Sequence, residues 1–122
     1  MSVDNYSGSA QLLDRAKKVL AGGVSSEFRK YNHPHAIFYT HGKGSKLYDV
    51  DGNVYLDFTL SQGPLILGHS HPHVLKSVYD YSELGQLFAG QHIKEVLLAE
   101  KLHHLIPSAE LMRFCLDGSE AV

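Results

Sequence analysis

The stretch GSKLYDVDGNVYLDF, at Gly44–Phe58, holds two short runs of strand-forming residues separated by a glycine turn. Lys46–Val50 and Val54–Phe58 are predicted strands, and the DGN turn between them uses the tolerance of glycine for positive φ. Upstream, Ala36–Tyr39 is predicted as a further strand, and the segment HGKG joins it to Lys46–Val50. The stretch and its flank therefore predict a small antiparallel meander.

Apolar residues recur at helical spacing on both sides of this meander. The spacing predicts helices over Gln11–Ala21, from Pro72 to Gly85, and from about His92 to Ile106. Ser9 is expected to cap the first of these helices. Further along, Leu111–Leu116 is apolar with a single charge and predicts a buried strand. This order of helix, meander, two helices and strand predicts an α/β protein.

Composition and charge exclude several classes of protein. The chain has 122 residues, of which 43 % are hydrophobic, and this suits one globular core of moderate size. Lysine and arginine number 11 against 13 acidic residues, with no basic block, so nucleic acid is not an expected partner. No apolar run approaches the ~20 residues that cross a bilayer, so no membrane partner is expected. The single cysteine, Cys115, forms no internal disulfide, and the lack of a signal-peptide pattern predicts a cytoplasmic protein.

The residues after the last predicted strand, Asp117-Gly118-Ser119, have an order that can cradle an anion. Glycine lets a ligand approach the backbone closely, and the N–H groups at a helix start favour negative charge. The hydroxyl of Ser119 can add one hydrogen bond. A plain turn with a helix cap explains the same residues, and neither nucleotide-binding glycine fingerprint is present. From these residues alone, both interpretations stay open.

Two further motifs raise the question of a metal. Three histidines alternate in GHSHPH at Gly68–His73 and, on a strand, could bind zinc on one face. Pro72 argues against an extended central strand, so we expect the first two histidines to shape and cap the turn into the next helix. The run DVDGN resembles the start of a calcium loop, but Val54 and Leu60 occupy the positions that require glycine and glutamate. A hairpin turn accounts for these acids, and no metal site is predicted.

Arg29 is a candidate binding residue in an irregular stretch, Val24–His35, that follows a glycine pair. A guanidinium on a loop can hold a carboxylate through two parallel hydrogen bonds. Most loop arginines are simply solvated, and chemistry alone leaves both possibilities open.

Several segments together carry a resemblance to a known family: LAGGVSSEFR, GSKLYDVDGNVYLDF, GPLILGHSHPHV, LLAEKL and MRFCLDGSEA. In this order and spacing they resemble the N-terminal part of the class III pyridoxal-phosphate-dependent aminotransferases, closest to the glutamate-1-semialdehyde 2,1-aminomutase branch. The likeness runs from about Leu12 to Val122. It implies the N-terminal portion of a fold-type I aminotransferase fold. Residues 1–58 would belong to the small domain, and residues 59–122 would form the connecting loop and first elements of a truncated large domain.

The resemblance implies a role for the C-terminal turn. In the family this strand-to-helix turn holds the 5′-phosphate of pyridoxal 5′-phosphate, so Gly118 and Ser119 are implied cofactor-binding residues. Asp117 stands where the family usually has serine. A carboxylate beside a dianion is repulsive unless it points away or caps the helix.

The resemblance also implies substrate-binding residues. Arg29 aligns with the arginine that grips the substrate carboxylate, and Ser26 aligns with a neighbouring polar residue. Gln62 replaces a tryptophan that forms a flat wall in the aminomutases. Glutamate-1-semialdehyde or a related amino acid is the implied substrate, although this change, together with Glu27 and Phe28, weakens the case for glutamate-1-semialdehyde itself. A β-amino acid or another carboxylate-bearing amine is then the alternative.

The catalytic residues of the family come later in its chain. Its Schiff-base lysine is therefore expected outside these 122 residues, and no catalytic residue is predicted within them. The chain is expected to be a fragment, inactive alone, of an enzyme that is a homodimer when intact and acts on small-molecule amino-group donors and acceptors. A non-catalytic binding module that retains these N-terminal elements is the alternative from another class.

Overall fold

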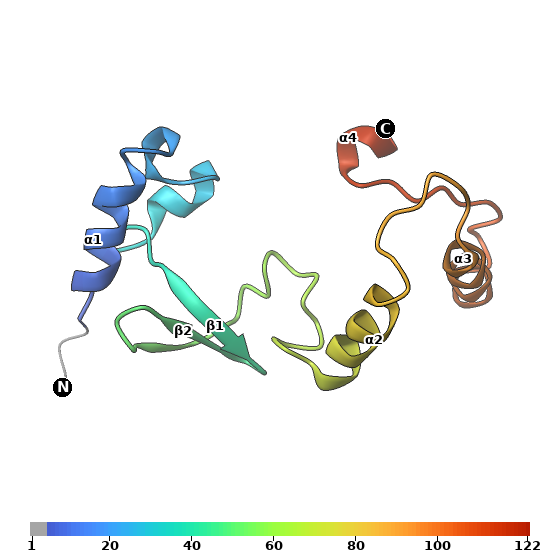
Figure 1. The fold of residues 1–122 in the computed structure, drawn as a ribbon, viewed down its shortest axis with the longest axis horizontal. Helices are drawn as coiled ribbons and strands as arrows, with labels where there is room; N and C mark the ends of the chain where they lie inside the picture. The colour runs from blue at the N-terminus through green and yellow to red at the C-terminus, as the bar shows by residue number, and fades with distance from the viewer. Residues whose placement is uncertain (1–4) are drawn as a thin grey trace. The chain divides into compact units, whose positions relative to one another are not determined.

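The computed structural model describes residues 5–122, which contain helices and a three-stranded antiparallel sheet (Figure 1). The chain forms two compact units, one ending at Val78 and the other running from Tyr79 to Val122, and each is described by itself. Among the described residues, every helix is too short or too polar to cross a membrane. The predicted domain boundary between residues 58 and 59 concerns the intact protein and stays a prediction.

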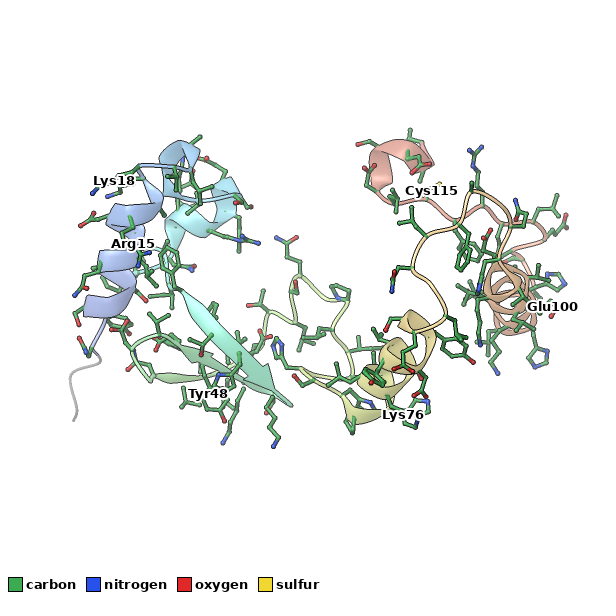
Figure 2. All side chains as sticks on the ribbon, in the orientation of Figure 1. Arg15, Lys18, Tyr48, Lys76, Glu100 and Cys115 are labelled. Carbon is green, nitrogen blue, oxygen red and sulfur yellow. The ribbon has the colours of Figure 1, made fainter. Side chains whose placement is uncertain are left out.

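The sheet of the first unit is the predicted meander. Its strands, in the spatial order β1-β2-β3, are β1 (Tyr39–Lys43), β2 (Lys46–Asp49) and β3 (Val54–Leu56). Both pairings are antiparallel. Tyr48 of β2 (Figure 2) stacks on the ring of His41 in β1, with 4.3 Å between ring centroids. The meander therefore joins its first two strands through ring stacking as well as through the backbone ladder.

The predicted position of the first strand, Ala36–Tyr39, is wrong. β1 begins at Tyr39, and the segment HGKG lies partly inside it rather than joining it to β2. Lys43 pairs with Lys46, which leaves Gly44-Ser45 as a two-residue turn. Gly44 has a φ of 57°, a conformation that glycine adopts without strain. The tight turn at Gly44 fixes the register of the strands on either side of it.

Helix α1 covers Ser7–Ala16, so it starts and ends earlier than the predicted Gln11–Ala21. The predicted cap at Ser9 is also wrong, because Ser9 lies inside the helix and is fully buried. Two short 3₁₀ helices follow: η1 (Ala21–Gly23) and η2 (Glu27–Tyr31). Helix η2 gives regular structure to part of Val24–His35, the stretch that was predicted to be irregular.

The N-terminus of α1 is capped by a side chain from the meander. The carboxylate of Asp51 accepts the backbone N–H of Gly8 at 2.6 Å and that of Ser9 at 2.9 Å. The hydroxyl of Ser9 in turn accepts the N–H of Phe38 at 3.3 Å. The start of α1 is therefore stabilised by the tight turn after β2, which is distant in sequence, in addition to the local contact in which Oδ1 of Asn5 accepts the N–H of Ser7 at 3.1 Å.

The acids of the DVDGN turn are occupied by donors of the chain itself. The carboxylate of Asp49 accepts the N–H groups of Asp51 (2.9 Å) and Asn53 (2.8 Å) and the hydroxyl of Tyr55 (2.7 Å). Burial raises the pKa of Asp49, but the hydrogen bonds, led by that from Tyr55, outweigh burial and hold this pKa below its ordinary value. Burial and the hydrogen bond to Asp49 also raise the pKa of Tyr55. A hairpin turn therefore accounts for these acids, as predicted.

Two longer helices follow the meander. Helix α2 (Pro72–Ser82) begins at the predicted proline and ends before Gly85. Helix α3 (Ile93–Leu105) lies within its predicted range and begins with a reciprocal cap at His92. The imidazole of His92 accepts the N–H of Lys94 at 3.2 Å, while the carboxylate of Glu95 accepts the N–H of His92 at 3.0 Å. Local sequence signals therefore suffice to place α3.

The predicted buried strand at Leu111–Leu116 is not formed among the described residues. No strand within residues 5–122 pairs with this segment, and Leu111 and Leu116 are 95 % and 98 % exposed. A strand exists only through hydrogen bonds to a neighbouring strand, so apolar composition alone does not produce one. The chain then enters the short helix α4 (Gly118–Ala121), shortly after the free thiol of Cys115 (Figure 2).

Candidate functional site

A cavity of about 490 Å³ opens in the first unit. All three residues predicted to bind substrate line it: Ser26, Arg29 and Gln62. Ser26 and Arg29 come from the segment around η2, whereas Gln62 comes from the loop after β3. Segments that are far apart in the chain therefore meet at one cavity.

The guanidinium of Arg29 is available to a ligand in this cavity. Arg29 is exposed, and it takes part in none of the ion pairs that form among the described residues. Its backbone N–H donates to the carbonyl of Ser26 at 3.0 Å, which ties together the two residues of this segment that line the cavity. An unpaired guanidinium in a concave site can hold a carboxylate through two parallel hydrogen bonds.

The acid that lines the same cavity, Asp57, is already engaged. One carboxylate oxygen lies 2.8 Å from Nε2 of His69, and the other accepts the N–H groups of Thr59 (2.9 Å) and Leu60 (3.0 Å). The hydrogen bond with His69 is the main cause that holds the pKa of Asp57 below its ordinary value. Because these donors already bind the carboxylate of Asp57, this carboxylate competes less with a ligand for the guanidinium of Arg29.

Sequence reasoning missed several residues that line this cavity, among them the titratable residues Tyr39, Asp57 and His69. Burial raises the pKa of Tyr39, and the negative charges of Asp57 and Asp49 add to the effect. The only sequence signals were an aspartate near the end of a predicted strand and a histidine after Gly68. Neither signal indicates that the two side chains touch.

The histidine motif does not gather into a metal site. The side chain of His69 pairs with Asp57, and its backbone pairs with Gly44 across an isolated bridge. The carbonyl of His71 accepts the N–H of Leu75 at 3.0 Å at the start of α2. Within residues 5–122, no three His, Cys, Asp or Glu side chains lie close enough together to hold a metal ion.

The C-terminal turn lies in the second unit. Asp117 is the N-cap of α4, and its carboxylate accepts the N–H of Glu120 at 2.9 Å. The carboxylate of Glu120 accepts the N–H of Leu116 at 3.0 Å, so the two acids brace the turn reciprocally. Gly118 and Ser119 are exposed, and a Cβ at Gly118 would meet no atom within 4 Å. The approach to these two residues is therefore open.

Known proteins are similar to this chain in sequence and fold. The chain is similar to glutamate-1-semialdehyde 2,1-aminomutase 1 of Staphylococcus carnosus, with 41 % identity over 118 residues that make up 95 % of this chain and 28 % of that protein. It is similar to the solved structure of a transaminase with PLP bound, with 32 % identity, a TM-score of 0.89, and coverage of 98 % of this chain and 28 % of that one. A β-phenylalanine aminotransferase from Variovorax paradoxus gives 26 % identity, a TM-score of 0.86, and coverage of 97 % and 27 %.

The chain spans 28 % of the length of the Staphylococcus carnosus aminomutase. The family model for aminotransferase class III matches residues 28–122, which include Arg29, Gln62 and the C-terminal turn. This match, with the curated and structural relatives, confirms the resemblance seen in the sequence. The chain therefore belongs to the class III aminotransferase family.

Proposed function

We propose that this chain is the N-terminal part of a pyridoxal-phosphate-dependent aminotransferase or aminomutase that moves an amino group on a carboxylate-bearing substrate. The observation that supports this proposal most directly is the cavity lined by Ser26, Arg29 and Gln62. The chain that forms this cavity belongs to the class III family. Arg29 binds the substrate carboxylate with both of its outer nitrogens. Ser26 adds a hydroxyl beside it, and Gln62 offers an amide that can both donate and accept.

The cofactor-binding residues are Gly118 and Ser119. They fit a phosphate because both are exposed and because the backbone at Gly118 can be approached without obstruction. The backbone N–H groups at the start of α4 and the hydroxyl of Ser119 donate to the phosphate oxygens. Asp117 is compatible with this role, since its carboxylate is held by the N–H of Glu120. Pyridoxal phosphate, when bound, supplies the electron sink on which amino-group transfer depends.

The remaining parts of the enzyme lie outside this chain, including the Schiff-base lysine, so the chain alone is inactive. Residues 1–58 belong to the small domain, and residues 59–122 lead into the large domain. The exposure of Leu111 and Leu116 supports this proposal, because further strands of a large-domain sheet would cover them. The intact protein is a cytoplasmic homodimer.

A β-amino acid is the second candidate substrate class. Gln62 on the cavity wall favours it over glutamate-1-semialdehyde, because an amide replaces the flat aromatic wall implied by the aminomutase pattern. The similarity to a β-phenylalanine aminotransferase is consistent with this choice. A non-catalytic binding module is the remaining alternative. Activity of the full-length protein would exclude this alternative, and lack of activity would favour it.

The test is an assay of the full-length protein, loaded with pyridoxal phosphate, on a panel of amines. Glutamate-1-semialdehyde, α-amino acids and β-amino acids are compared with the same amines lacking the carboxylate. We expect turnover only with carboxylate-bearing substrates. Equal rates with the decarboxylated amines would contradict the role of Arg29, and no turnover with any amine would favour the binding module.

A further inference from the structure

The loop that carries Gln62 to the cavity contains a run of left-handed backbone. Leu60, Ser61 and Gln62 have φ values of 49°, 53° and 68°. Residues with a Cβ avoid this region, and for each such residue the penalty corresponds to roughly tenfold in a conformational equilibrium. Ser61 and Gln62 both line the cavity. A strained turn therefore presents the side chains on one wall of the candidate site.

The turn is closed by its own backbone on one side. The N–H of Gly63 lies within hydrogen-bond distance of the carbonyls of Thr59 (3.1 Å) and Leu60 (3.0 Å), and the N–H of Leu65 donates to the carbonyl of Leu60 at 3.2 Å. These bonds close the turn that the left-handed run makes. They do not by themselves anchor the turn to the sheet.

Asp57 supplies the anchor at the start of the turn. One of its carboxylate oxygens accepts the N–H groups of Thr59 and Leu60, the two residues that lead into the run. The other oxygen lies 2.8 Å from Nε2 of His69, and the Asp57 side chain is only 4 % exposed. The carboxylate thus ties the beginning of the loop to a residue that follows its end.

His69 is itself fixed on the meander. Its backbone N–H and carbonyl pair with Gly44 at 2.8 and 2.9 Å. Its imidazole packs so closely on Gly42 that a Cβ there would lie 2.5 Å from the ring. The next residue, Ser70, donates from its hydroxyl to the carbonyl of Gly42 at 2.9 Å. His69 is therefore a rigid point on the hairpin that joins β1 and β2.

From this chain of contacts we infer that Asp57 and His69 are positioning residues, which hold the run Leu60–Gln62 in its left-handed form and so set Ser61 and Gln62 against the cavity. Neither residue is required to touch substrate for this role. The consequence for substrate binding rests on the proposed function, whereas the control of the turn itself does not.

The first test measures amide hydrogen exchange in the full-length protein over residues 59–65. In His69→Ala and Asp57→Ala, we expect the N–H groups of Gly63 and Leu65 to exchange roughly tenfold faster than in the wild type. Tyr55→Phe is the matched control. It removes one hydrogen bond to a carboxylate in the same meander, that to Asp49, and keeps the ring.

The second test uses glycine to relieve the strain. Glycine adopts positive φ freely, so Leu60→Gly added to His69→Ala should bring the exchange of Gly63 and Leu65 back toward the wild-type rate. A merely structural role for His69 predicts no such rescue. If Asp57→Ala fails to fold, His69→Ala alone still decides the outcome, because it leaves both backbone hydrogen bonds to Asp57 in place.

The kinetic readout is separate from the exchange readout. In the active full-length enzyme, His69→Ala should raise KM for the carboxylate-bearing substrate by roughly tenfold with a smaller change in kcat, and Leu60→Gly should reverse part of it. Unchanged exchange in His69→Ala, or an equal increase in Tyr55→Phe, would overturn the inference. An inactive wild-type protein would sink the proposed function, while the exchange data would still decide whether Asp57 and His69 hold the turn.

Discussion

The carboxylate of Asp117 accepts the backbone N–H of Glu120 at 2.9 Å, and so the acid at the start of the C-terminal turn is the cap of α4. Aspartate and serine are both good helix caps, so the replacement of the usual serine by Asp117 preserves the local geometry. It adds a negative charge next to the proposed phosphate site. The cap and the charge can be separated by substitution.

Asp117→Asn should keep the cap and remove the charge, whereas Asp117→Ala should remove both. We expect the affinity of the full-length protein for pyridoxal phosphate to be unchanged or tighter in Asp117→Asn. In Asp117→Ala it should fall, because losing a cap costs about 0.5–2 kcal/mol. Cofactor dissociation constants measured by equilibrium titration check this. Equal affinities for the two variants would show that the cap plays no part in binding.

Gly118→Val should weaken cofactor binding more than Ser119→Ala. The valine side chain blocks close approach of the phosphate, whereas the loss of the Ser119 hydroxyl removes one charge-assisted hydrogen bond worth about 1.5–3 kcal/mol. Gly90→Val is the matched control, since a Cβ at Gly90 also meets no atom within 4 Å. The same titration applies, and a Gly118→Val protein that binds cofactor like the Gly90→Val control would refute the close approach.

Arg29→Lys should lower kcat/KM for the best carboxylate-bearing substrate. Lysine keeps the charge but loses the two-point grip, at a cost of about 1–3 kcal/mol in transition-state binding. Arg15→Lys is the control, because Arg15 lies on α1 (Figure 2) and does not line the cavity. Steady-state kinetics of the full-length enzyme measure both. If kcat/KM in Arg29→Lys were as high as in the Arg15→Lys control, Arg29 would not bind the substrate carboxylate.

Asp51→Ala should destabilise the protein by about 1–2 kcal/mol, because two N–H groups in the first turn of α1 lose their acceptor. Asp14→Ala is the control: Asp14 is 76 % exposed and forms only a surface ion pair with Lys17. Such pairs contribute about 0–1 kcal/mol. Urea denaturation monitored by circular dichroism compares the two variants, and equal midpoints would show that Asp51 does not stabilise α1.

The unfolding free energy should fall as the pH drops below about 4, the ordinary pKa of an aspartate. The pKa values of Asp49 and Asp57 are lower in the folded chain than their ordinary value, so the unfolded chain binds protons first. The stability that these carboxylates contribute is present above their unfolded pKa and is lost as the pH falls through their folded pKa.

Asp49→Asn should be less stable at neutral pH and should show a shallower loss of stability between about pH 5 and pH 2. Denaturant midpoints across this range supply the measurement. The pH dependence of stability that remains in this variant comes in part from Asp57, which the substitution leaves unchanged. A pH dependence identical to that of the wild type would mean that Asp49 is not a linked group.

Local signals predicted the elements that depend on their own residues. Helical spacing of apolar residues predicted α3, and the glycine in DGN marked the turn between β2 and β3. Prediction failed where a distant partner decides the outcome. The start of α1 depends on Asp51, and the Leu111–Leu116 segment needs a neighbouring strand to become one.

The sequence by itself determined the antiparallel meander, apart from the position of its first strand, and the two longer helices. Its resemblance to the family implied Ser26, Arg29 and Gln62 as candidate substrate residues. Only the tertiary structure decided that these three residues share one cavity and that Asp57 pairs with His69 beside them. The physical reason is that helical periodicity, caps and tight turns are short-range properties of a few adjacent residues. A cavity depends on where the backbone brings distant side chains, and here a left-handed turn held from both ends sets the position of Gln62.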